Sequence, residues 1–219
     1  MKKIIPLIIT VAALATSPLP AEESKDELPL VFSEDFENGF ERWDLTDPNG
    51  WTHRKVDGNH VFGINARNNN YKPKVRSPHH IALIKDVALS DFVLTFRVRS
   101  TKDTGNHRDC CVFFNHQDPT HFYYVHLGAK PDPHSGQIMI VNGAPRKAIT
   151  QNENKVPWTG DWHRVKVKRD SKKGTIEIYF DDMEKPIMTA NDTTFGKGRI
   201  GIGSFDDMND FDDIELRGR

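Results

Sequence analysis

The sequence predicts an all-β domain, a two-sheet antiparallel β-sandwich, and three observations support this prediction. From Leu30 onward, short runs of alternating apolar and polar residues are divided by Gly, Pro, Asn and Asp. Many short strands with regular turn signals are typical of sandwiches and barrels. No segment shows the apolar stripe of a long helix. The chain also has no repeat and no linker, so we expect a single domain over residues 30–219.

The clearest predicted strand is Asp91–Ser100. Every second residue from Phe92 to Val98 is apolar, whereas Arg97 and Arg99 fall on the opposite, wetter face. The segment 65–74 is rich in Asn and Lys and is expected to form a long surface loop. The other expected strands are a hairpin of 162–169 and 175–180 around the turn 171–174, together with 112–114, 121–128, 137–141, 198–205 and 210–217.

The N-terminus has the features of a secretory signal peptide. Lys2 and Lys3 precede an apolar run over Ile4–Ala15, and small residues lead to Ala21. We expect residues 1–21 to be removed as a signal peptide and residues 22–29 to form a flexible leader. The protein is therefore predicted to be exported, to the periplasm or outside the cell. The apolar run is shorter than the about 20 residues that cross a bilayer, so no membrane span is expected.

Charge and cysteine content exclude other classes of protein. The chain carries 30 Lys and Arg against 31 Asp and Glu, without the basic excess of a nucleic-acid-binding domain. Cys110 and Cys111 are adjacent, and neighbours on a strand point to opposite faces, so two free thiols are predicted. No Cys or His spacing is typical of zinc. We expect no catalytic cofactor and a monomeric protein.

A set of polar and aromatic residues is predicted to line a groove on one sheet. In the segment His121–Gly128, Tyr124 and His126 share the face opposite the more apolar one, so both are expected to point out of the sheet. If the strands are neighbours, the other members converge with them. Those members are Arg97, Arg99, Asn115, His116, Asn142 and Arg146, with Trp158 as an exposed platform for a sugar ring.

Such a groove is suited to two activities. In β-elimination on a uronic acid, Arg97 would help to neutralise the carboxylate, His126 would take the proton and Tyr124 would protonate the leaving oxygen. In binding alone, the aromatic residue would stack on the sugar while Arg and Asn hold hydroxyls or a carboxylate. A polar sheet face without a special role is the third interpretation. Hydrolysis would need two carboxylates, and none of the loop aspartates Asp103, Asp109, Asp118 and Asp132 is singled out.

Acidic residues gather near both ends of the domain. Glu34, Asp35 and Glu37 open the first expected strand, and five aspartates surround the last: Asp206, Asp207, Asp210, Asp212 and Asp213. If these strands lie side by side, their hard oxygen ligands would suit a structural calcium ion. The alternative is a solvated acidic edge, which protects an edge strand from pairing with another chain.

Several segments resemble the concanavalin A-like lectin and glucanase jelly rolls. They are 32–37, 91–100, 111–115, 121–126, 160–165, 198–204 and 211–216. Within this superfamily they are most similar to the 3-keto-disaccharide hydrolase group and to laminin-G-like domains. The Glu-x-Asp-x-x-Glu strand of the glucanases is absent. The resemblance implies a jelly roll that acts on a poly- or oligosaccharide, cleaving a glycosidic bond by hydrolysis or elimination. The alternatives are a non-catalytic glycan-binding module and a laminin-G-like protein interaction domain.

Overall fold

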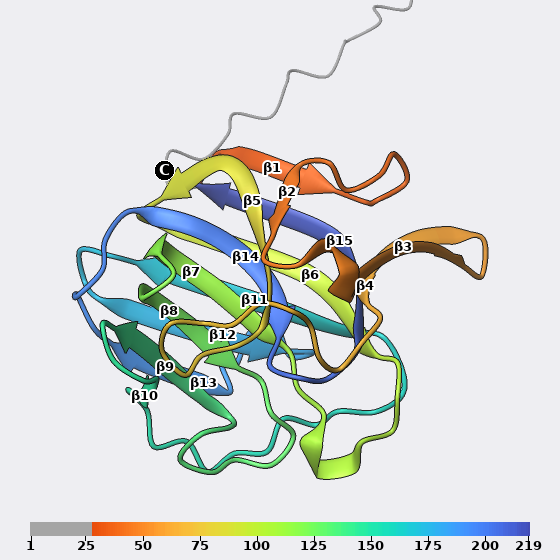
Figure 1. Ribbon diagram of the computed structural model, residues 1–219. Coiled ribbons are helices and arrows are strands. Elements are labelled where there is room, and N and C mark those ends of the chain that lie inside the picture. Colours follow the sequence, from red (N-terminus) through yellow and green to blue (C-terminus); the bar gives the residue numbers. More distant parts are fainter. Residues whose placement is uncertain (1–27) are drawn as a thin grey trace, which may run out of the picture.

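The computed structural model describes residues 28–219, and within them it contains two antiparallel sheets packed face to face (Figure 1). The predicted all-β sandwich is therefore confirmed. The predicted signal peptide and most of the predicted leader lie outside the described residues. Among the described residues, the only helices are two single 3₁₀ turns, Pro48–Gly50 and Gly105–His107, and neither is long and apolar enough to cross a membrane.

The first sheet has eight strands, in the order β13-β12-β11-β6-β15-β4-β3, with β1 also paired to β15. The last strand of the described chain, β15, thus lies inside this sheet, between β6 on one side and β1 and β4 on the other. The strands are β1 (Leu30–Glu34), β3 (Trp51–Val56), β4 (Asn59–Ile64), β6 (Phe92–Ser100), β11 (His163–Asp170), β12 (Thr175–Phe180), β13 (Met188–Asn191) and β15 (Asn209–Gly218).

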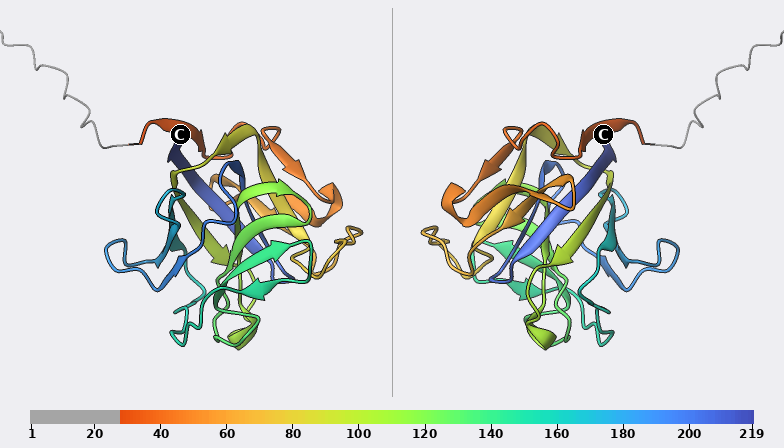
Figure 2. Two further views of the ribbon diagram at one scale, coloured as in Figure 1. Left: turned by 90° about the vertical axis from the view of Figure 1, so that its left-hand side faces the viewer. Right: turned by 90° about the vertical axis from the view of Figure 1, so that its right-hand side faces the viewer.

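The second sheet has seven strands, in the order β10-β9-β8-β7-β14-β5-β2. Within it, β7 pairs with both β8 and β14. The strands are β2 (Trp43–Leu45), β5 (His80–Leu89), β7 (Cys111–Asp118), β8 (His121–His126), β9 (Gln137–Asn142), β10 (Lys147–Ala148) and β14 (Gly198–Ser204). The further views show the two layers, with long connections gathered at the end opposite the C-terminus (Figure 2).

Alternation along the strands builds the main core between the sheets. In β6, the residues from Phe92 to Val98 that were predicted to face inward are buried there. The predicted hairpin is β11 and β12, and it pairs antiparallel as expected. In β14, a Cβ at Gly203 would lie 1.9 Å from the carbonyl oxygen of His80, so only glycine allows β14 to lie this close to β5.

A second, smaller apolar cluster lies on the outer face of the seven-stranded sheet. It includes Phe113, Phe122 and Tyr124, and all three are fully buried. Tyr71 and Val75 of the connection between β4 and β5 pack against it. The segment predicted as a surface loop is therefore a cover, and it closes the face on which the groove was expected.

A buried cation joins the two sheets at one end. Arg169 of β11 is 2% exposed, and its Nε donates to Asn115 Oδ1 of β7 across 3.2 Å. Its terminal nitrogens donate to the carbonyl oxygens of Gly174, Asp192 and Phe195. Three of these four bonds are buried and the bond to Asp192 is partly buried, so losing the guanidinium would leave several acceptors unsatisfied.

We expect Arg169→Ala to lower the free energy of unfolding by about 3 to 5 kcal/mol, because it leaves buried acceptors without a hydrogen-bond donor. Urea denaturation followed by tryptophan fluorescence measures this change. The control is Arg164→Ala, an exposed arginine on the same strand, where a change within about 0.5 kcal/mol is expected. Equal effects of the two substitutions would show that the buried arginine does not hold the sheets together.

Candidate functional site

A cleft of about 550 Å³ lies at the end of the sandwich where the long connections gather. Its wall comes from the β4–β5 cover, the loop after β6, the connections on either side of β9 and the β14–β15 turn. Three of its cations have no carboxylate partner among the described residues. They are Arg76, Lys130 and Arg146. The fourth, Arg67, is paired with Asp206 at 2.7 Å. Against these four cations the cleft has three carboxylates, Asp109, Asp132 and Asp206, which leaves an excess of one positive charge.

Arg146 stacks on an aromatic ring at the base of this cleft. Its guanidinium carbon lies 4.2 Å from the centre of the Phe205 ring. Two of its nitrogens, Nε and Nη1, are buried without a hydrogen-bond partner. Stacking holds the guanidinium plane while leaving its donors free. An oxygen acceptor that reached this guanidinium would meet a charged donor group whose Nε and Nη1 have no partner among the described residues.

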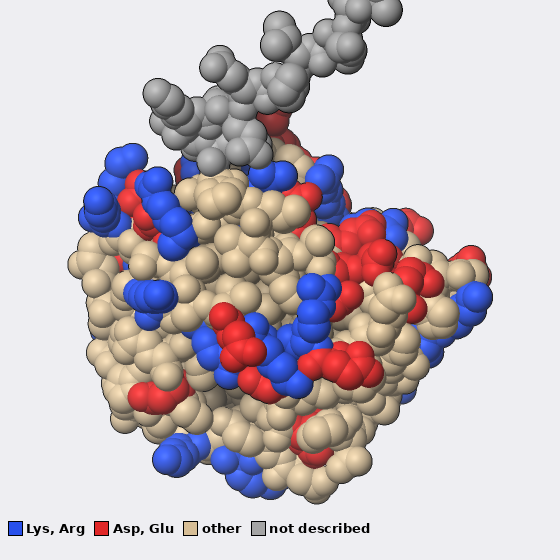
Figure 3. All heavy atoms as spheres, turned by 90° about the horizontal axis from the view of Figure 1, so that it is seen from above, with Lys and Arg blue, Asp and Glu red and all other residues tan. Residues whose placement is uncertain are grey.

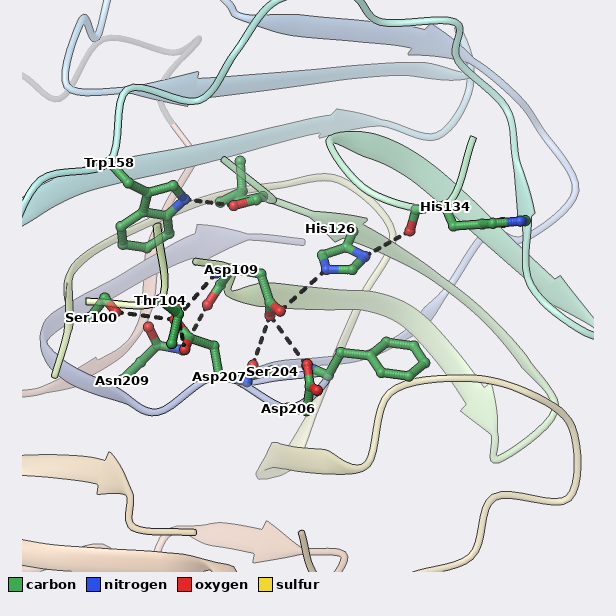
Figure 4. A network of polar contacts seen from close by, with 12 residues as sticks. Ser100, Thr104, Asp109, His126, His134, Trp158, Ser204, Asp206, Asp207 and Asn209 are labelled. Atoms are coloured by element: carbon green, nitrogen blue, oxygen red, sulfur yellow. Dashed lines mark hydrogen bonds and ion pairs between the residues drawn. The ribbon is translucent and has the colours of Figure 1, made fainter. Parts of the chain in front are cut away.

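Asp109 is the centre of a buried polar network beside the cleft (Figure 4). Its Oδ1 accepts from Ser204 Oγ at 2.7 Å and from the Phe205 backbone at 3.3 Å. Its backbone carbonyl accepts from Asn209 Nδ2 at 2.8 Å. These bonds attach the segment before β7 to the β14–β15 turn, which explains why a carboxylate is buried here.

His126 lies at the end of β8 with both ring nitrogens engaged. Its Nδ1 lies 2.9 Å from the carbonyl oxygen of His134 and therefore donates to it. Its Nε2 faces Asp109 Oδ2 at 3.4 Å. The bond to His134 fixes the ring orientation, so Nε2 points permanently toward the carboxylate (Figure 4).

Asp207 is close to Asp109 but turned away from the cleft. Its carboxylate accepts from Ser100 Oγ, Thr104 Oγ1 and the Asp109 backbone. Burial, followed by the charge of Asp109, raises the pKa of Asp207 to about 6. This acid therefore serves the internal network and does not line the cleft.

Of the predicted groove residues, only His126 and Arg146 line this cleft. Tyr124 was expected to point outward into solvent, but it is fully buried beneath the β4–β5 cover. Its hydroxyl has no hydrogen-bond partner, and burial raises its pKa well above the ordinary value. The alternation along β8 placed Tyr124 on the correct face, but the loop covers that face.

Arg97 and Arg99 do not join this groove, contrary to expectation. They lie on the outer face of the eight-stranded sheet, whereas His126 belongs to the other sheet. Arg97 pairs with Asp212 at 2.8 Å, and Arg99 pairs with Asp210 at 3.0 Å. Each guanidinium also lies 5.0 Å from the Trp162 ring. The charges of both arginines are therefore already neutralised by aspartates of β15.

Asn115 and Trp158 were expected at the surface and are instead part of the interior. Asn115 is fully buried, where it accepts from Arg169 and donates to the Leu89 carbonyl. Trp158 packs in the main core, and its indole nitrogen donates to the Leu127 carbonyl at 2.7 Å. Neither is accessible to a ligand.

His116 and Asn142 lie away from the cleft as well. His116 lines a separate hollow with Tyr71 and Arg199. Asn142 is exposed and pairs with His121, at the opposite end of β8 from His126. Register along β8 and β9 therefore separates these residues from the predicted partners.

The residues predicted to bind calcium are only partly brought together. Asp35 and Asp213 line one hollow near β1, at an end where acidic and basic side chains are interspersed (Figure 3). Glu37 does not line this hollow, and its carboxylate instead binds the His60 ring at 2.8 Å. Asp213 pairs with Arg97 at 2.8 Å. Calcium binding here stays a prediction.

Several cleft residues were not predicted from the sequence. Arg67, Arg76 and Phe205 had no local signal because they lie in turns and in the cover. Asp109 was named only as one of several loop acids. It lies just before β7, and its bonds to Ser204 and Asn209 are long-range contacts that have no local signal in the sequence. Both cysteines are free and buried, as expected.

No family model matches the sequence, and no curated protein matches it either. The fold is similar to the carbohydrate-binding module CBM66 from Bacillus subtilis, with a TM-score of 0.58, 16% identity, and 81% and 96% of the two chains covered. The similarity to cellulose induced protein Cip1 has a TM-score of 0.58 and 14% identity, and it covers 86% of this chain and 98% of Cip1. A third similar structure is domain 4 of AbnA, a GH43 extracellular arabinanase from Geobacillus stearothermophilus, in complex with arabinotriose. Its TM-score is 0.56 at 11% identity, and the match covers 88% of this chain and 94% of that domain.

These likenesses confirm the predicted concanavalin A-like sandwich. At identities of 16% or less they show the fold alone. The predicted place within the 3-keto-disaccharide hydrolase group stays a prediction.

His116 makes the stability of the domain depend on pH. Burial, with a smaller effect of Arg199, lowers its pKa from the ordinary 6.5 to about 4. As the pH falls below 6.5, the unfolded chain takes up a proton that the folded chain excludes until about pH 4, so stability is lost across this window. We expect the wild type to lose roughly 2 kcal/mol more than His116→Gln between pH 7 and pH 4.5.

Urea denaturation of both proteins at the two pH values measures this difference. All other ionisable groups are the same in the two proteins, so their contributions cancel in the comparison. Parallel loss of stability in the two proteins would contradict a buried, neutral His116.

Proposed function

We propose that this chain is a glycan-binding protein whose loop-end cleft holds an acidic group of a sugar, such as a uronic acid carboxylate. The observation that carries the proposal is the unpaired guanidinium of Arg146, stacked on Phe205 with Nε and Nη1 free. Removal of its first 21 residues, as predicted, would place this binding outside the cytoplasm.

The other cleft groups complete a site for such a ligand. Arg76 and Lys130 add positive charge without carboxylate partners among the described residues. Asn68, Asn106 and Ser135 contribute uncharged donors and acceptors. A carboxylate gains charge-assisted hydrogen bonds from a guanidinium, while amides and hydroxyls match sugar hydroxyls. The arrangement therefore favours an acidic sugar over a neutral one.

The similar structures support a carbohydrate as the ligand. One is a carbohydrate-binding module, and another is an arabinanase domain solved with arabinotriose. Similar folds therefore support the class of ligand, and the cations of the cleft support its acidic character.

Catalysis is less well supported than binding. Elimination needs a free base and an accessible acid. The Nδ1 of His126 is held by His134 and its Nε2 faces a carboxylate, while the hydroxyl of Tyr124 is buried. Hydrolysis needs two carboxylates across the sugar. Of the three acids of the cleft, Asp109 is bonded to Ser204 and faces His126, and Asp206 is paired with Arg67, which leaves Asp132 without a second free carboxylate. Cleavage of a glycosidic bond stays a prediction, and the incubation described below tests it.

We expect the chain without residues 1–21 to bind polygalacturonate or alginate and to bind neutral arabinan or xylan much more weakly. Arg146→Ala should weaken binding at least about tenfold, because a charge-assisted hydrogen bond contributes about 1.5 to 3 kcal/mol. Affinity electrophoresis and calorimetry measure the loss. The matched control is Arg99→Ala, which removes a paired arginine from the other sheet and should leave the affinity unchanged.

Retention of affinity in Arg146→Ala, or stronger binding to the neutral glycans, would overturn the proposal. In parallel, reducing ends and the absorbance of a new unsaturated uronate are followed during incubation. Reducing ends with new absorbance would mean elimination, and reducing ends alone would mean hydrolysis. Either product would replace the binding proposal with an enzymatic one.

A further inference from the structure

Three side chains with metal-binding groups meet at the base of the cleft. They are Asp109, Cys111 and His126, all buried, and their ligand atoms lie within 4.8 Å of one another. Asp109 lies just before β7, and Cys111 is the first residue of that strand. Cys111 is directly opposite His126 in the antiparallel pair of β7 and β8. Strand pairing thus brings together residues whose sequence spacing is not typical of a zinc site.

The oxygen ligand of Asp109 and the nitrogen ligand of His126 are each held in place by groups outside the site. Oδ1 of Asp109 is occupied by Ser204 and Phe205, which leaves Oδ2 toward the site. Nδ1 of His126 is bound to the His134 carbonyl, which directs Nε2 toward the site. Supporting bonds of this kind orient the ligands of metal sites.

The separation of these ligand atoms fits a tetrahedral ion. Oδ2 of Asp109 and Nε2 of His126 lie 3.4 Å apart, which is longer than an ordinary hydrogen bond. Oxygen and nitrogen ligands each about 2.1 Å from a tetrahedral zinc ion lie about 3.4 Å from one another. The two atoms therefore stand at the spacing that a shared ion requires.

The Cys111 thiol is an independent indication of a ligand. It is 0% exposed and has no hydrogen-bond partner among the described residues. The thiol of the neighbouring Cys110 lies among apolar side chains of the main core, whereas Cys111 lies on the outer face of the sheet, beside two candidate ligands. The Cys111 sulfur is therefore positioned to bind a metal ion as a thiolate ligand.

We propose that Asp109, Cys111 and His126 form a three-ligand site for a divalent ion of the zinc type, with its fourth position open to the cleft. Thiolate and imidazole ligands select zinc-like ions over calcium and magnesium. Two anionic ligands neutralise the ion, so the site adds no net charge beside Arg146. Three protein ligands with one open position are the arrangement of catalytic zinc sites. This proposal does not depend on the glycan proposal.

Cobalt titration of the metal-depleted chain without residues 1–21 tests the site without any glycan. We expect one Co²⁺ per chain, a near-ultraviolet charge-transfer band from thiolate to cobalt, and visible bands of a four-coordinate ion. Zn²⁺ should abolish these bands and raise the unfolding temperature, whereas Ca²⁺ and Mg²⁺ should do neither. Failure of the wild type to bind one Co²⁺ with a thiolate band would overturn the proposal.

Matched variants assign the ligands. Cys111→Ala should lose the thiolate band and weaken cobalt binding by at least about tenfold, and His126→Ala should also weaken it. Cys110→Ala removes the neighbouring thiol from the opposite face and should retain both the band and the affinity. Far-ultraviolet circular dichroism checks that each variant is folded. Retention of the band in Cys111→Ala, or its loss in folded Cys110→Ala, would contradict the assignment.

Arg146→Ala separates this proposal from the previous one. We expect it to bind cobalt as the wild type does while losing affinity for the acidic glycan. Loss of cobalt binding in the folded Arg146→Ala protein would contradict the three-ligand assignment. Glycan binding without cobalt binding in the wild type would overturn the metal site alone.

Discussion

The buried guanidinium of Arg169 is the interaction on which the arrangement of the two sheets depends. It reaches from β11 across the core to Asn115 of β7 and caps carbonyl oxygens of the turns beside it. Asn115 itself has a positive φ of 45°, at the irregular part of β7 where the register with β8 shifts. A buried charge is costly unless its donors are satisfied, so these partners must all be in place together. One end of β7 is thereby tied to the opposite sheet.

The other end of β7 is held in a different way, and this difference produces the cleft. Asp109, just before the strand, is bonded to the β14–β15 turn and leaves one carboxylate oxygen toward His126. Loops, rather than a partner sheet, surround this end. Arg76 and Lys130 of these loops are exposed to water, whereas Nε and Nη1 of Arg146 are buried without a partner. The same carboxylate thus closes the internal network and opens onto a positively charged hollow.

The fold was predictable because alternation is a local property, whereas much of the site depends on distant contacts. The faces of β6, β11 and β12 follow directly from their sequences, and so does the face that carries Tyr124 and His126. The sequence does not show that β6 and β8 belong to different sheets, and for this reason Arg97 was assigned to the wrong groove. It also does not show that residues 65–79 cover an apolar face, which buries Tyr124. The hairpin of β3 and β4 was missed because β3 is largely polar and β4 carries its apolar residues as a short run without alternation.

The position of β15 has a consequence for how the chain acquires its fold. This strand follows all others of the described chain, yet it forms the seam between β6 and the pair of β1 and β4. Until it is present, three strands expose unpaired backbone edges, and such edges promote association with other chains. Contacts between residues so far apart in sequence also form slowly. The domain is therefore expected to remain open during synthesis and to close in one late step, when its final strand becomes available.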